Sequence, residues 1–384
     1  MHFAIVSYGF YQGNTRLQPW RYVYEMACRL PKKGFETTIL TDKENAAQPR
    51  DVKVIEGVPI TPMASPRLLR QIKTLSPDVI FWPLGPRSFA FLPLLSRLGG
   101  KVVGYLPGPV LGWADFQAAW KARLGEWREA AAWLIARRLG WGAAMAKCCA
   151  ELVVMSQWNK QMLLAMGVPD ERIHFIPAGR DPLPVSGNSG KLCDKGTESN
   201  EDKIALFMGW PTRVRGIDLL LDSFAIAKRK CPHLRLVILA RGEGSSAHQA
   251  LYRRVASHPA KAHIRIIEGF LSPEEVRLHI EACDFGVLPF LLVPADRPLS
   301  FLEFFAAGKP VITTDAAGLP ELVADGRGLA SKRGNPREMA KAIVDLTTES
   351  AERMEERCGA GVDFIRRYPD WDSCAAEFAA IIRC

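Results

Sequence analysis

The feature that most constrains the fold is a regular alternation of short apolar runs with amphipathic helical stretches, interrupted only once. In the first half the runs are rich in β-forming residues and read HFAIVSY, ETTILTD, DVIFWPL, KVVGYLPG, ELVVMS and RIHFIPAG. Parallel strands need long connections between them, and the intervening helices supply these. The alternation therefore predicts a mostly parallel sheet that is covered by helices on both faces.

The interruption is a polar stretch over residues 183–203, which we expect to be a flexible linker because it is rich in Gly, Ser and charged residues. After it the alternation restarts with IALFMGW, LRLVILA, IRIIEGF, FGVLPF and PVITTD. The predicted architecture is α/β, with one Rossmann-like, doubly wound domain over residues 1–182 and a second over residues 204–365. Two such domains that face each other form a cleft, and ligands bind at the carboxyl ends of the strands there.

The excess positive charge lies in the first domain. Residues 1–182 contain 23 Lys and Arg against 14 Asp and Glu, whereas residues 183–384 contain 27 of each. This asymmetry favours an anionic partner, such as a phosphorylated substrate or a membrane surface, over a basic solvated face without a ligand. Nucleic acid is disfavoured, because the sequence has no helix-turn-helix spacing, zinc-finger ligands or aromatic RNA-binding signature.

Several features predict a cytoplasmic protein. The sequence shows no basic leader, and no stretch approaches the roughly 20 apolar residues of a membrane-spanning helix. The nine cysteines are scattered without a CxxC pair, so neither a disulfide framework nor a zinc site is expected. Peripheral attachment to the inner face of the membrane remains compatible with this prediction.

Residues 298–323, PLSFLEFFAAGKPVITTDAAGLPELV, contain the most informative motif. The segment predicts a helix, a turn of small residues, a strand and a second helix, and the amino end of the first helix would face the cleft. Such an end presents unpaired N–H groups and partial positive charge to a phosphate. Glu303 near the helix start could accept hydrogen bonds from a ribose diol, or it could be a first-turn acid that favours the helix dipole.

This segment resembles the signature of retaining glycosyltransferase family 4, whose members have the two-domain GT-B fold. The resemblance extends over four further segments: LFMGWPTRVRGIDLLLDSFAIAKRKCPHLRLVILARGEG, IRIIEGFLSPEEVRLHIEACDFGVLPF, ELVVMSQWNKQMLLAMGVPDERIHFIPAGRD and YPDWDSCAAEF. It implies a nucleotide-sugar donor bound by residues 204–365 and an acceptor held by residues 1–182. It also implies that residues 366–384, after Trp371, form a helix that crosses back to the first domain.

The resemblance assigns roles to individual residues. Glu303 would hold the ribose, and Arg215 would neutralise the departing phosphate, with Arg213 close enough in sequence to help. Backbone positions that would approach the donor diphosphate are Gly13, Asn14, Leu299, Ser300 and Phe301. Phe270 and Leu271 would meet the nucleobase at a strand end.

The sequence departs from the family pattern at three places. The first acid of the family's pair is replaced by Ala295, and Asp296 beside it is the nearest catalytic candidate. The donor-site residue Gly209 is followed by Trp210 where the family has a phosphate-binding arginine. Phe81 and Pro107 occupy the places expected for a histidine of the first domain.

The resemblance implies a metal-independent hexosyltransferase that retains anomeric configuration and has no cofactor besides a UDP-, GDP- or ADP-linked donor. Its acceptor would be a lipid-linked or phosphorylated saccharide of envelope or polysaccharide biosynthesis. Fixed guanidinium groups in a dry cleft stabilise the charge that develops on a leaving diphosphate. Two alternatives are a degenerate GT-B protein that binds a nucleotide sugar or partner without turnover, and a nucleotide-sugar epimerase.

A tryptophan stripe in the basic domain is the last candidate feature. Trp113, Trp120, Trp127 and Trp141 follow a seven-residue spacing, and basic residues that include Arg123 lie between them. Aromatic rings flanked by cations suit attachment to an anionic membrane or lipid acceptor. The same spacing also fits a helix that simply packs on its own domain.

Overall fold

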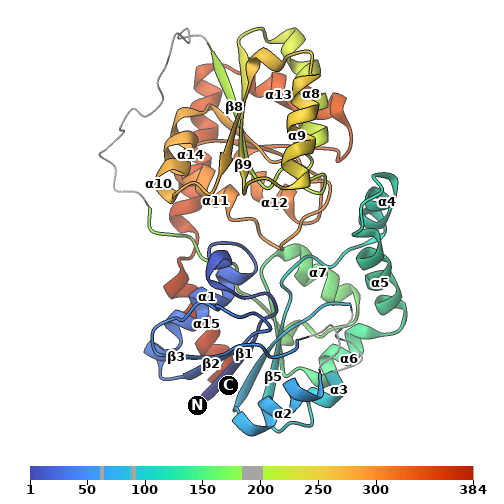
Figure 1. Ribbon diagram of the computed structural model, residues 1–384, viewed down its shortest axis with the longest axis vertical. Coiled ribbons are helices and arrows are strands. Elements are labelled where there is room, and N and C mark those ends of the chain that lie inside the picture. The colour runs from blue at the N-terminus through green and yellow to red at the C-terminus, as the bar shows by residue number, and fades with distance from the viewer. Residues whose placement is uncertain (61–64, 87, 89–91, 184–201, 384) are drawn as a thin grey trace.

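The computed structural model describes residues 1–60, 65–86, 88, 92–183 and 202–383 and contains two parallel β-sheets, each covered by helices (Figure 1). The two sheets belong to two domains, one above the other in Figure 1. This confirms the predicted α/β fold with two Rossmann-like domains.

The N-terminal sheet has seven strands in the order β3-β2-β1-β4-β5-β6-β7, all parallel. They are β1 (His2–Val6), β2 (Glu36–Leu40), β3 (Val52–Ile55), β4 (Val79–Pro83), β5 (Lys101–Tyr105), β6 (Glu151–Val154) and β7 (Ile173–Phe175). The sequence analysis missed β3, an edge strand of four residues that is only partly buried, so its apolar signal is weak.

Helices cover both faces of this sheet. They are α1 (Trp20–Arg29), α2 (Pro66–Leu75), α3 (Leu92–Leu95), α4 (Trp113–Lys121), α5 (Trp127–Arg138), α6 (Trp141–Cys148) and α7 (Gln157–Ala165). Successive residues of a strand point to opposite faces. Accordingly Phe3 and Ile5 of β1 belong to one hydrophobic core, and Ala4 and Val6 belong to the other.

The C-terminal sheet has six parallel strands in the order β10-β9-β8-β11-β12-β13. Its strands are β8 (Lys203–Gly209), β9 (Leu234–Arg241), β10 (Ile264–Gly269), β11 (Phe285–Val287), β12 (Val311–Thr314) and β13 (Gly328–Ser331). Its helices are α8 (Ile217–Lys230), α9 (Ser246–Ala256), α10 (Pro273–Ala282), α11 (Ser300–Ala306), α12 (Leu319–Val323), α13 (Pro336–Thr347) and α14 (Ala351–Arg367). The sequence analysis missed β13, GLAS, whose small residues give no β-forming run.

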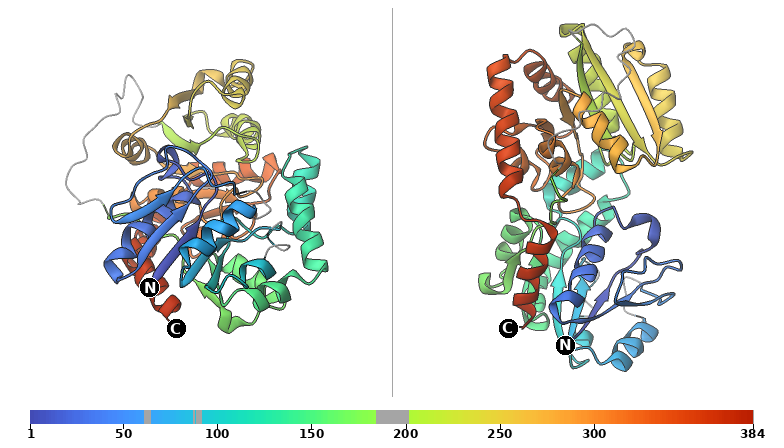
Figure 2. Two further views of the ribbon diagram at one scale, coloured as in Figure 1. Left: turned by 60° about the horizontal axis from the view of Figure 1, so that its bottom comes forward. Right: turned by 90° about the vertical axis from the view of Figure 1, so that its left-hand side faces the viewer.

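The last helix, α15 (Trp371–Arg383), lies on the N-terminal domain (Figure 2, right-hand view). It follows α14 of the C-terminal domain after a short connection, and its buried side chains join the core that covers β1. The ring of Phe378 packs edge-on against Phe3 and Phe81, with centroid distances of 5.5 and 5.0 Å.

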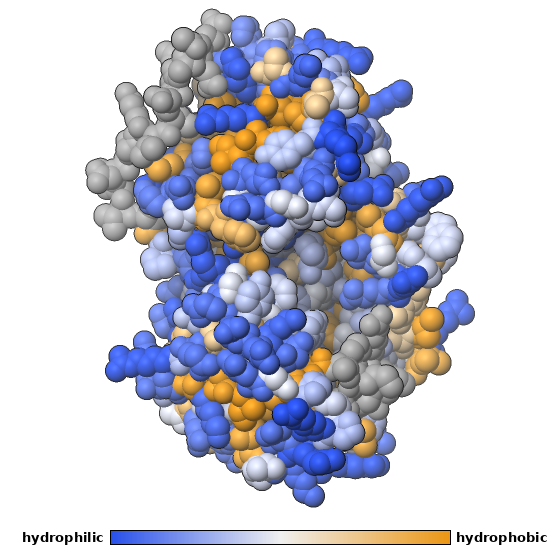
Figure 3. Space-filling model, in the orientation of Figure 1, coloured by the Kyte–Doolittle hydropathy of each residue, from blue (hydrophilic) through white to orange (hydrophobic). Residues whose placement is uncertain are grey.

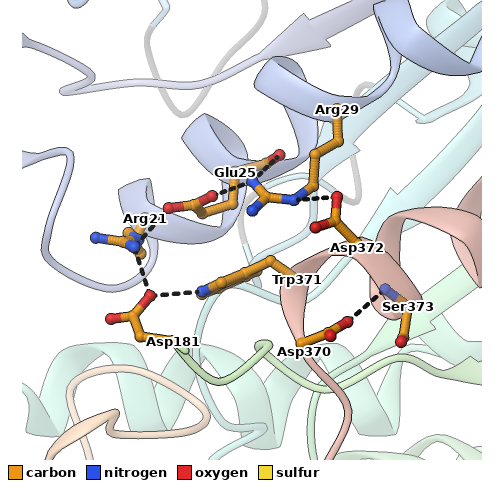
Figure 4. Close-up of polar contacts among 8 residues, drawn as sticks. All are labelled: Arg21, Glu25, Arg29, Asp181, Asp370, Trp371, Asp372 and Ser373. Carbon is orange, nitrogen blue, oxygen red and sulfur yellow. Dashed lines mark hydrogen bonds and ion pairs between the residues drawn. The ribbon is translucent and has the colours of Figure 1, made fainter. Parts of the chain in front are cut away.

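Carboxylates fix the start of α15 to α1 and to the end of the first domain (Figure 4). Asp181 accepts a hydrogen bond from Trp371 Nε1 at 3.2 Å and pairs with Arg21 at 2.7 Å. Asp370 accepts a hydrogen bond from the Ser373 N–H at 2.8 Å and so caps the helix. Asp372 pairs with Arg29 of α1, and the Asp-Trp-Asp sequence therefore serves the junction between helices.

The predicted linker lies largely outside the described residues, which resume at Asp202. Asp202 pairs with Arg235 of β9 at 2.6 Å, and Lys203 is the first residue of β8. The second sheet thus begins one residue earlier than the sequence analysis placed it, because the strand starts with a lysine rather than with the apolar run.

Candidate functional site

Glu303 lies in the first turn of α11 and faces cationic side chains from both domains. Its side chain is exposed to solvent, yet the surrounding protein atoms still raise the pKa of the carboxyl by partial desolvation. The charge of Asp181 acts in the same direction, whereas Arg16, Arg241 and Arg21 oppose the shift. The carboxylate therefore lies in the electrostatic field of arginines from both domains, and its role in holding a ribose stays a prediction.

Arg215 lies in the tight turn that follows β8. Gly216 makes this turn possible, because it has a φ of +77° and a Cβ there would lie 1.7 Å from the carbonyl oxygen of Pro289. The guanidinium lies 5.6 Å from the centroid of the Phe290 ring, and its Nη1 is 3.0 Å from where a Cβ on Gly209 would stand. Gly209 therefore leaves room for the arginine to cross the end of β8.

Arg215 is half-buried, and the charge of a second arginine acts on it. Burial lowers the pKa of its guanidinium, and the charge of Arg241 lowers it further. Within the described residues Arg215 forms no ion pair with a carboxylate. A desolvated, uncompensated cation is a strong electrostatic attractor for a phosphate group.

Arg213 pairs with a carboxylate, whereas the sequence analysis expected it to help Arg215 at the phosphate. Its Nε pairs with Asp218 in the first turn of α8 at 3.1 Å, and its side chain is mostly exposed. Asp218 also contacts Arg254 of α9 at 3.4 Å, so Arg213 belongs to a surface ion-pair group. A phosphate role for Arg213 stays a prediction, and the cation that the structure brings beside Arg215 is Arg241.

Arg241 and Arg16 act on Glu303 but were not selected from the sequence, and the same is true of Arg21, which pairs with Asp181. Arg241 is the last residue of β9, and Arg16 follows the 3₁₀ turn Gln12–Asn14 in the loop after β1. Arg241 could have been selected because it is an arginine at the carboxyl end of a strand next to β8. Side chains there point toward the edge of the sheet at which ligands bind.

Asp296 is buried where the two domains meet. Its carboxylate accepts hydrogen bonds from Ser156 Oγ at 2.6 Å and from the Met155 N–H at 3.2 Å, both in the N-terminal domain. Burial raises the pKa of Asp296 to about 6, although the Ser156 hydrogen bond and Arg297 oppose the shift. Both carboxylate oxygens are thus engaged by protein groups that link the domains, and a catalytic role for Asp296 stays a prediction.

The backbone positions expected to approach a diphosphate have distinct environments. The Phe301 and Leu302 amides bond to carbonyl oxygens of Pro298 and Leu299, whereas those of Leu299 and Ser300 form no backbone hydrogen bond within the described part of the chain. At the other side, Asn14 uses its side chain to close its own loop, donating to the Gly9 carbonyl at 2.5 Å and accepting from the Tyr11 N–H at 3.1 Å.

Gly13 and the base-facing residues complete the predicted set. Gly13 turns without a side chain, since a Cβ there would lie 2.6 Å from the Tyr11 ring. Phe270 is 65% exposed, and Leu271 packs into the core of the C-terminal domain. The Trp210 ring lies 6.3 Å from that of Phe270 and covers Gly242, where a Cβ would approach it to 2.5 Å. An aromatic surface therefore adjoins the arginines.

Phe81, one of the two positions at which the resemblance predicts a histidine, lies in the hydrophobic core of the N-terminal domain. Phe81 is fully buried and stacks on Tyr105 with a centroid distance of 4.1 Å. The carbonyl of Pro107 accepts a hydrogen bond from the Asp296 N–H at 3.4 Å and so belongs to the domain contact. Neither position presents a titratable side chain to the cleft.

The tryptophan stripe is divided between surface and core. Trp141 is buried and packs edge-on against Trp133 at 4.6 Å, so this end of the stripe is core. On α4 and α5, which we call the aromatic hairpin (residues 113–138), Trp113 and Trp120 are 60% and 59% exposed. Trp127 is half-buried, with its ring 5.3 Å from that of Trp120.

The aromatic hairpin also carries cations and a recess. A recess of about 480 Å³ is lined by Trp120, Arg123, Leu124, Gly125, Trp127 and Arg128. In Figure 3 apolar and charged side chains lie side by side along the right-hand edge, over this hairpin. Arg333 of the C-terminal domain pairs with Asp115 of α4 at 2.5 Å, so the base of the hairpin also contacts the C-terminal domain.

The described residues contain neither a metal-binding cluster nor a membrane-spanning helix. Within those ranges, no three His, Cys, Asp or Glu side chains are grouped so that they could hold a metal ion. Among the helices of the described segments, none combines the length and apolar character needed to cross a bilayer.

Family models match both halves of the chain. A model described as Glycosyltransferase Family 4 matches residues 20–182, and one described as Glycosyl transferases group 1 matches residues 202–349. Among curated proteins, the chain is 29% identical over 177 residues to the uncharacterized glycosyltransferase MJ1178 of Methanocaldococcus jannaschii, a match that covers 44% of each chain. It is 23% identical over 207 residues to the amylovoran biosynthesis glycosyltransferase AmsK of Erwinia amylovora, covering 52% of this chain and 48% of that one.

The curated matches thus span less than half of these relatives' length. A similarity in fold extends over the whole chain. The structure of HepE from Anabaena in complex with UDP and glucose superimposes with a TM-score of 0.72 at 14% identity, covering 100% of this chain and 99% of HepE.

Proposed function

The chain belongs to glycosyltransferase family 4 and has the GT-B fold, and on this premise we propose that it is an enzyme that transfers a sugar from a nucleotide-sugar donor. The donor binds mainly to residues 204–365. The acceptor binds to the basic N-terminal domain, and the reaction takes place in the cleft between them.

The observation that carries the proposal is the set of charges around Glu303 and Arg215: Arg16 and Arg241 both lower the pKa of Glu303, and Arg241 lowers that of Arg215. Breaking the anomeric C–O bond leaves negative charge on a nucleoside diphosphate. Guanidinium groups that are already in place stabilise this charge most strongly where water is excluded. Glu303, beside them, is suited to accept hydrogen bonds from the ribose hydroxyls.

We infer a retaining, metal-independent reaction with no cofactor apart from the donor. In this proposal the guanidinium charges do the work that a divalent cation does in other transferases. The acceptor hydroxyl attacks from the face that the diphosphate leaves, and a phosphate oxygen takes its proton. The family resemblance supports this stereochemistry.

The proposed acceptor is a lipid-linked or phosphorylated saccharide of envelope or polysaccharide biosynthesis. The excess of positive charge in residues 1–182 supports an anionic acceptor. The name of the relative AmsK, which refers to amylovoran biosynthesis, supports a role in glycan assembly. The proposed location is the cytoplasm, with the aromatic hairpin resting on the inner face of the membrane.

The membrane part of the proposal predicts the behaviour of a double variant. Trp120→Ala with Trp127→Ala should weaken binding to liposomes that contain anionic lipid by about tenfold or more, since two rings lose their apolar contact. Sedimentation with liposomes measures this effect. Tyr252→Ala, which removes an exposed aromatic side chain from α9, is the matched control. Unchanged sedimentation of the double variant would refute membrane contact by this hairpin.

The donor part of the proposal predicts selective stabilisation by one nucleoside diphosphate. In a thermal-shift screen of UDP, GDP, ADP and their sugars, the matching ligand should add about 2.7 kcal/mol at a concentration of 100 Kd. The corresponding nucleoside should have a much smaller effect, because it lacks the groups that the arginines bind. A screen in which no diphosphate raises the unfolding temperature would contradict donor binding.

A second candidate function is nucleotide-sugar binding without turnover. It is favoured by Ala295, which is buried, and by Phe81, which is a core residue where the family has a histidine. Assays of donor hydrolysis and of transfer to saccharide acceptors separate the two functions. Measurable binding of a nucleotide sugar with no product from any donor would favour the non-catalytic protein.

A further inference from the structure

The loop that precedes α11 leaves the C-terminal domain and lies against the N-terminal domain. The Asp296 N–H donates to the carbonyl oxygen of Pro107 at 3.4 Å, and a Cβ on Gly108 would stand 3.9 Å from the carbonyl oxygen of Pro294. Asp296 and Arg297 are 6% and 7% exposed. Two consecutive charged residues are therefore buried where the domains meet, and the burial of charge is unfavourable unless polar groups compensate for it.

Asp296 finds this compensation at the amino end of α7, a helix of the other domain. Ser156 is the N-cap residue of α7, and its Oγ accepts a hydrogen bond from the Asn159 N–H at 3.1 Å. The same hydroxyl donates to the Asp296 carboxylate at 2.6 Å, and the Met155 N–H donates to it at 3.2 Å. The carboxylate also lies at the positive end of the helix, where negative charge is favoured. A residue of the C-terminal domain thus stabilises the start of a helix in the N-terminal domain.

Asn159 extends this cluster of hydrogen bonds into the loop after β5. It is fully buried, and its side chain accepts from the Val110 N–H at 2.7 Å and donates to the Gly108 carbonyl at 3.0 Å. The loop after β5, the start of α7 and Asp296 are therefore joined by consecutive hydrogen bonds. We call this group the interdomain cap, and its members are Gly108, Val110, Met155, Ser156, Asn159 and Asp296.

The next residue of the loop also contacts both domains. The Arg297 guanidinium lies 5.9 Å from the centroid of the Phe175 ring, at the end of β7, and 5.4 Å from that of the Tyr368 ring, after α14. One ring belongs to each domain. The helix α11 begins at Ser300, directly after this anchored loop, and carries Glu303. A shift of the interdomain cap would therefore displace the helix that carries Glu303.

We propose that Asp296 is a positioning residue that caps α7 across the domain boundary and so fixes α11 and Glu303 relative to the N-terminal domain. This inference rests on the proposed function, in which a donor held by one domain reacts with an acceptor held by the other. Removing the carboxylate leaves the Ser156 hydroxyl and the Met155 N–H buried without this acceptor, a cost that favours opening of the contact to water. A displacement of about 1 Å between reacting groups is enough to slow a reaction by about 10²-fold.

Amide hydrogen exchange of the full chain, followed by mass spectrometry, tests the interdomain cap without a substrate. Asp296→Asn replaces one acceptor oxygen by a donor NH₂ group and should raise exchange at the start of α7 by about tenfold or more. Ser156→Ala should raise exchange in residues 294–302 of the other domain by a similar factor. Ser65→Ala is the control, because Ser65 caps α2 within the N-terminal domain, and it should leave exchange in residues 294–302 unchanged.

Transfer kinetics with the donor identified by thermal shift test the positioning role. Asp296→Asn and Ser156→Ala should each lower kcat by about tenfold or more, while the affinity for the donor, measured by calorimetry, stays within about twofold. The double variant should lose no more than the larger single loss, because both substitutions break the same contact. If Asp296 instead acted on the reacting atoms, only its own replacement would slow turnover.

Several results would contradict this role of Asp296 in distinguishable ways. Unchanged exchange in both single variants would exclude the interdomain cap. Altered exchange with wild-type turnover would exclude the positioning role and leave the proposed function standing. A loss of turnover in Asp296→Asn alone would assign the carboxylate to the chemistry. A wild-type chain that turns over no donor would remove the proposed function and the positioning role with it, and exchange alone would then decide whether Asp296 joins the domains. If Asp296→Asn fails to fold, both measurements on Ser156→Ala decide the result.

Discussion

Replacing Arg215 with alanine should reduce the rate of sugar transfer by about 10²- to 10³-fold, which corresponds to about 2.7–4 kcal/mol of lost transition-state stabilisation. The side chain is half-buried, has no carboxylate partner among the described residues and lies against the end of β8. Its charge is therefore available to the leaving diphosphate and is only partly screened by water. Steady-state kinetics with the donor identified by thermal shift measure the effect.

The pattern of the kinetic change distinguishes leaving-group stabilisation from simple donor binding. A group that acts mainly on developing charge lowers kcat together with kcat/KM, whereas uniform binding raises KM alone. Arg215→Lys should retain part of the rate, because it keeps the charge but loses the fork of donors. Arg337→Ala, on the exposed face of α13, is the control. Near wild-type turnover of Arg215→Ala in a folded protein would exclude the role.

The candidate site shows where sequence reasoning succeeds and where it ends. Glu303 and Arg215 could be selected because each lies in a recognisable local motif that a nearby glycine or helix start defines. Arg241 could have been selected from its place at the carboxyl end of a strand next to β8. Arg16 could not, since its loop has no distinctive neighbourhood and its charge acts on Glu303 only when the two domains meet. Contacts between residues more than 200 positions apart are set by domain packing, and no local pattern encodes it.

The sequence also did not predict which groups pair with the side chains of Arg213 and Asp296. Arg213 and Asp296 were selected because they stand close in sequence to important positions. In the structure Arg213 turns to Asp218, and Asp296 accepts hydrogen bonds from Ser156 and Met155. Proximity along the chain does not determine the direction of a side chain, particularly in a turn, where successive residues point to different sides.

For the fold, the strongly apolar strands were predictable and the two weak edge strands were not. β1 and β12 are fully or almost fully buried and have continuous apolar or β-branched sequences. β3 and β13 have only one neighbouring strand each, and a half-exposed strand tolerates lysine, glycine or alanine. Hydrophobic patterns thus specify the centre of a sheet better than its edges.

Replacing Phe378 with alanine should destabilise the N-terminal domain by about 3–5 kcal/mol, the largest stability effect that we expect from a single side chain. The ring is fully buried on α15, and it packs against Phe3 of β1 and Phe81 of β4. Removing it leaves a cavity at the contact through which the end of the chain covers the first sheet. Chemical denaturation monitored by circular dichroism and by tryptophan fluorescence measures the change in unfolding free energy.

Phe270→Ala provides the matched control, because the same chemical change is made at a ring that is 65% exposed. Its unfolding free energy should change by no more than about 0.5 kcal/mol. Calorimetry adds a second comparison: Phe378→Ala should lower the transition of the N-terminal domain more than that of the C-terminal domain, because its contacts lie in the first sheet. Equal stability of the two variants would mean that α15 does not pack on β1 and β4.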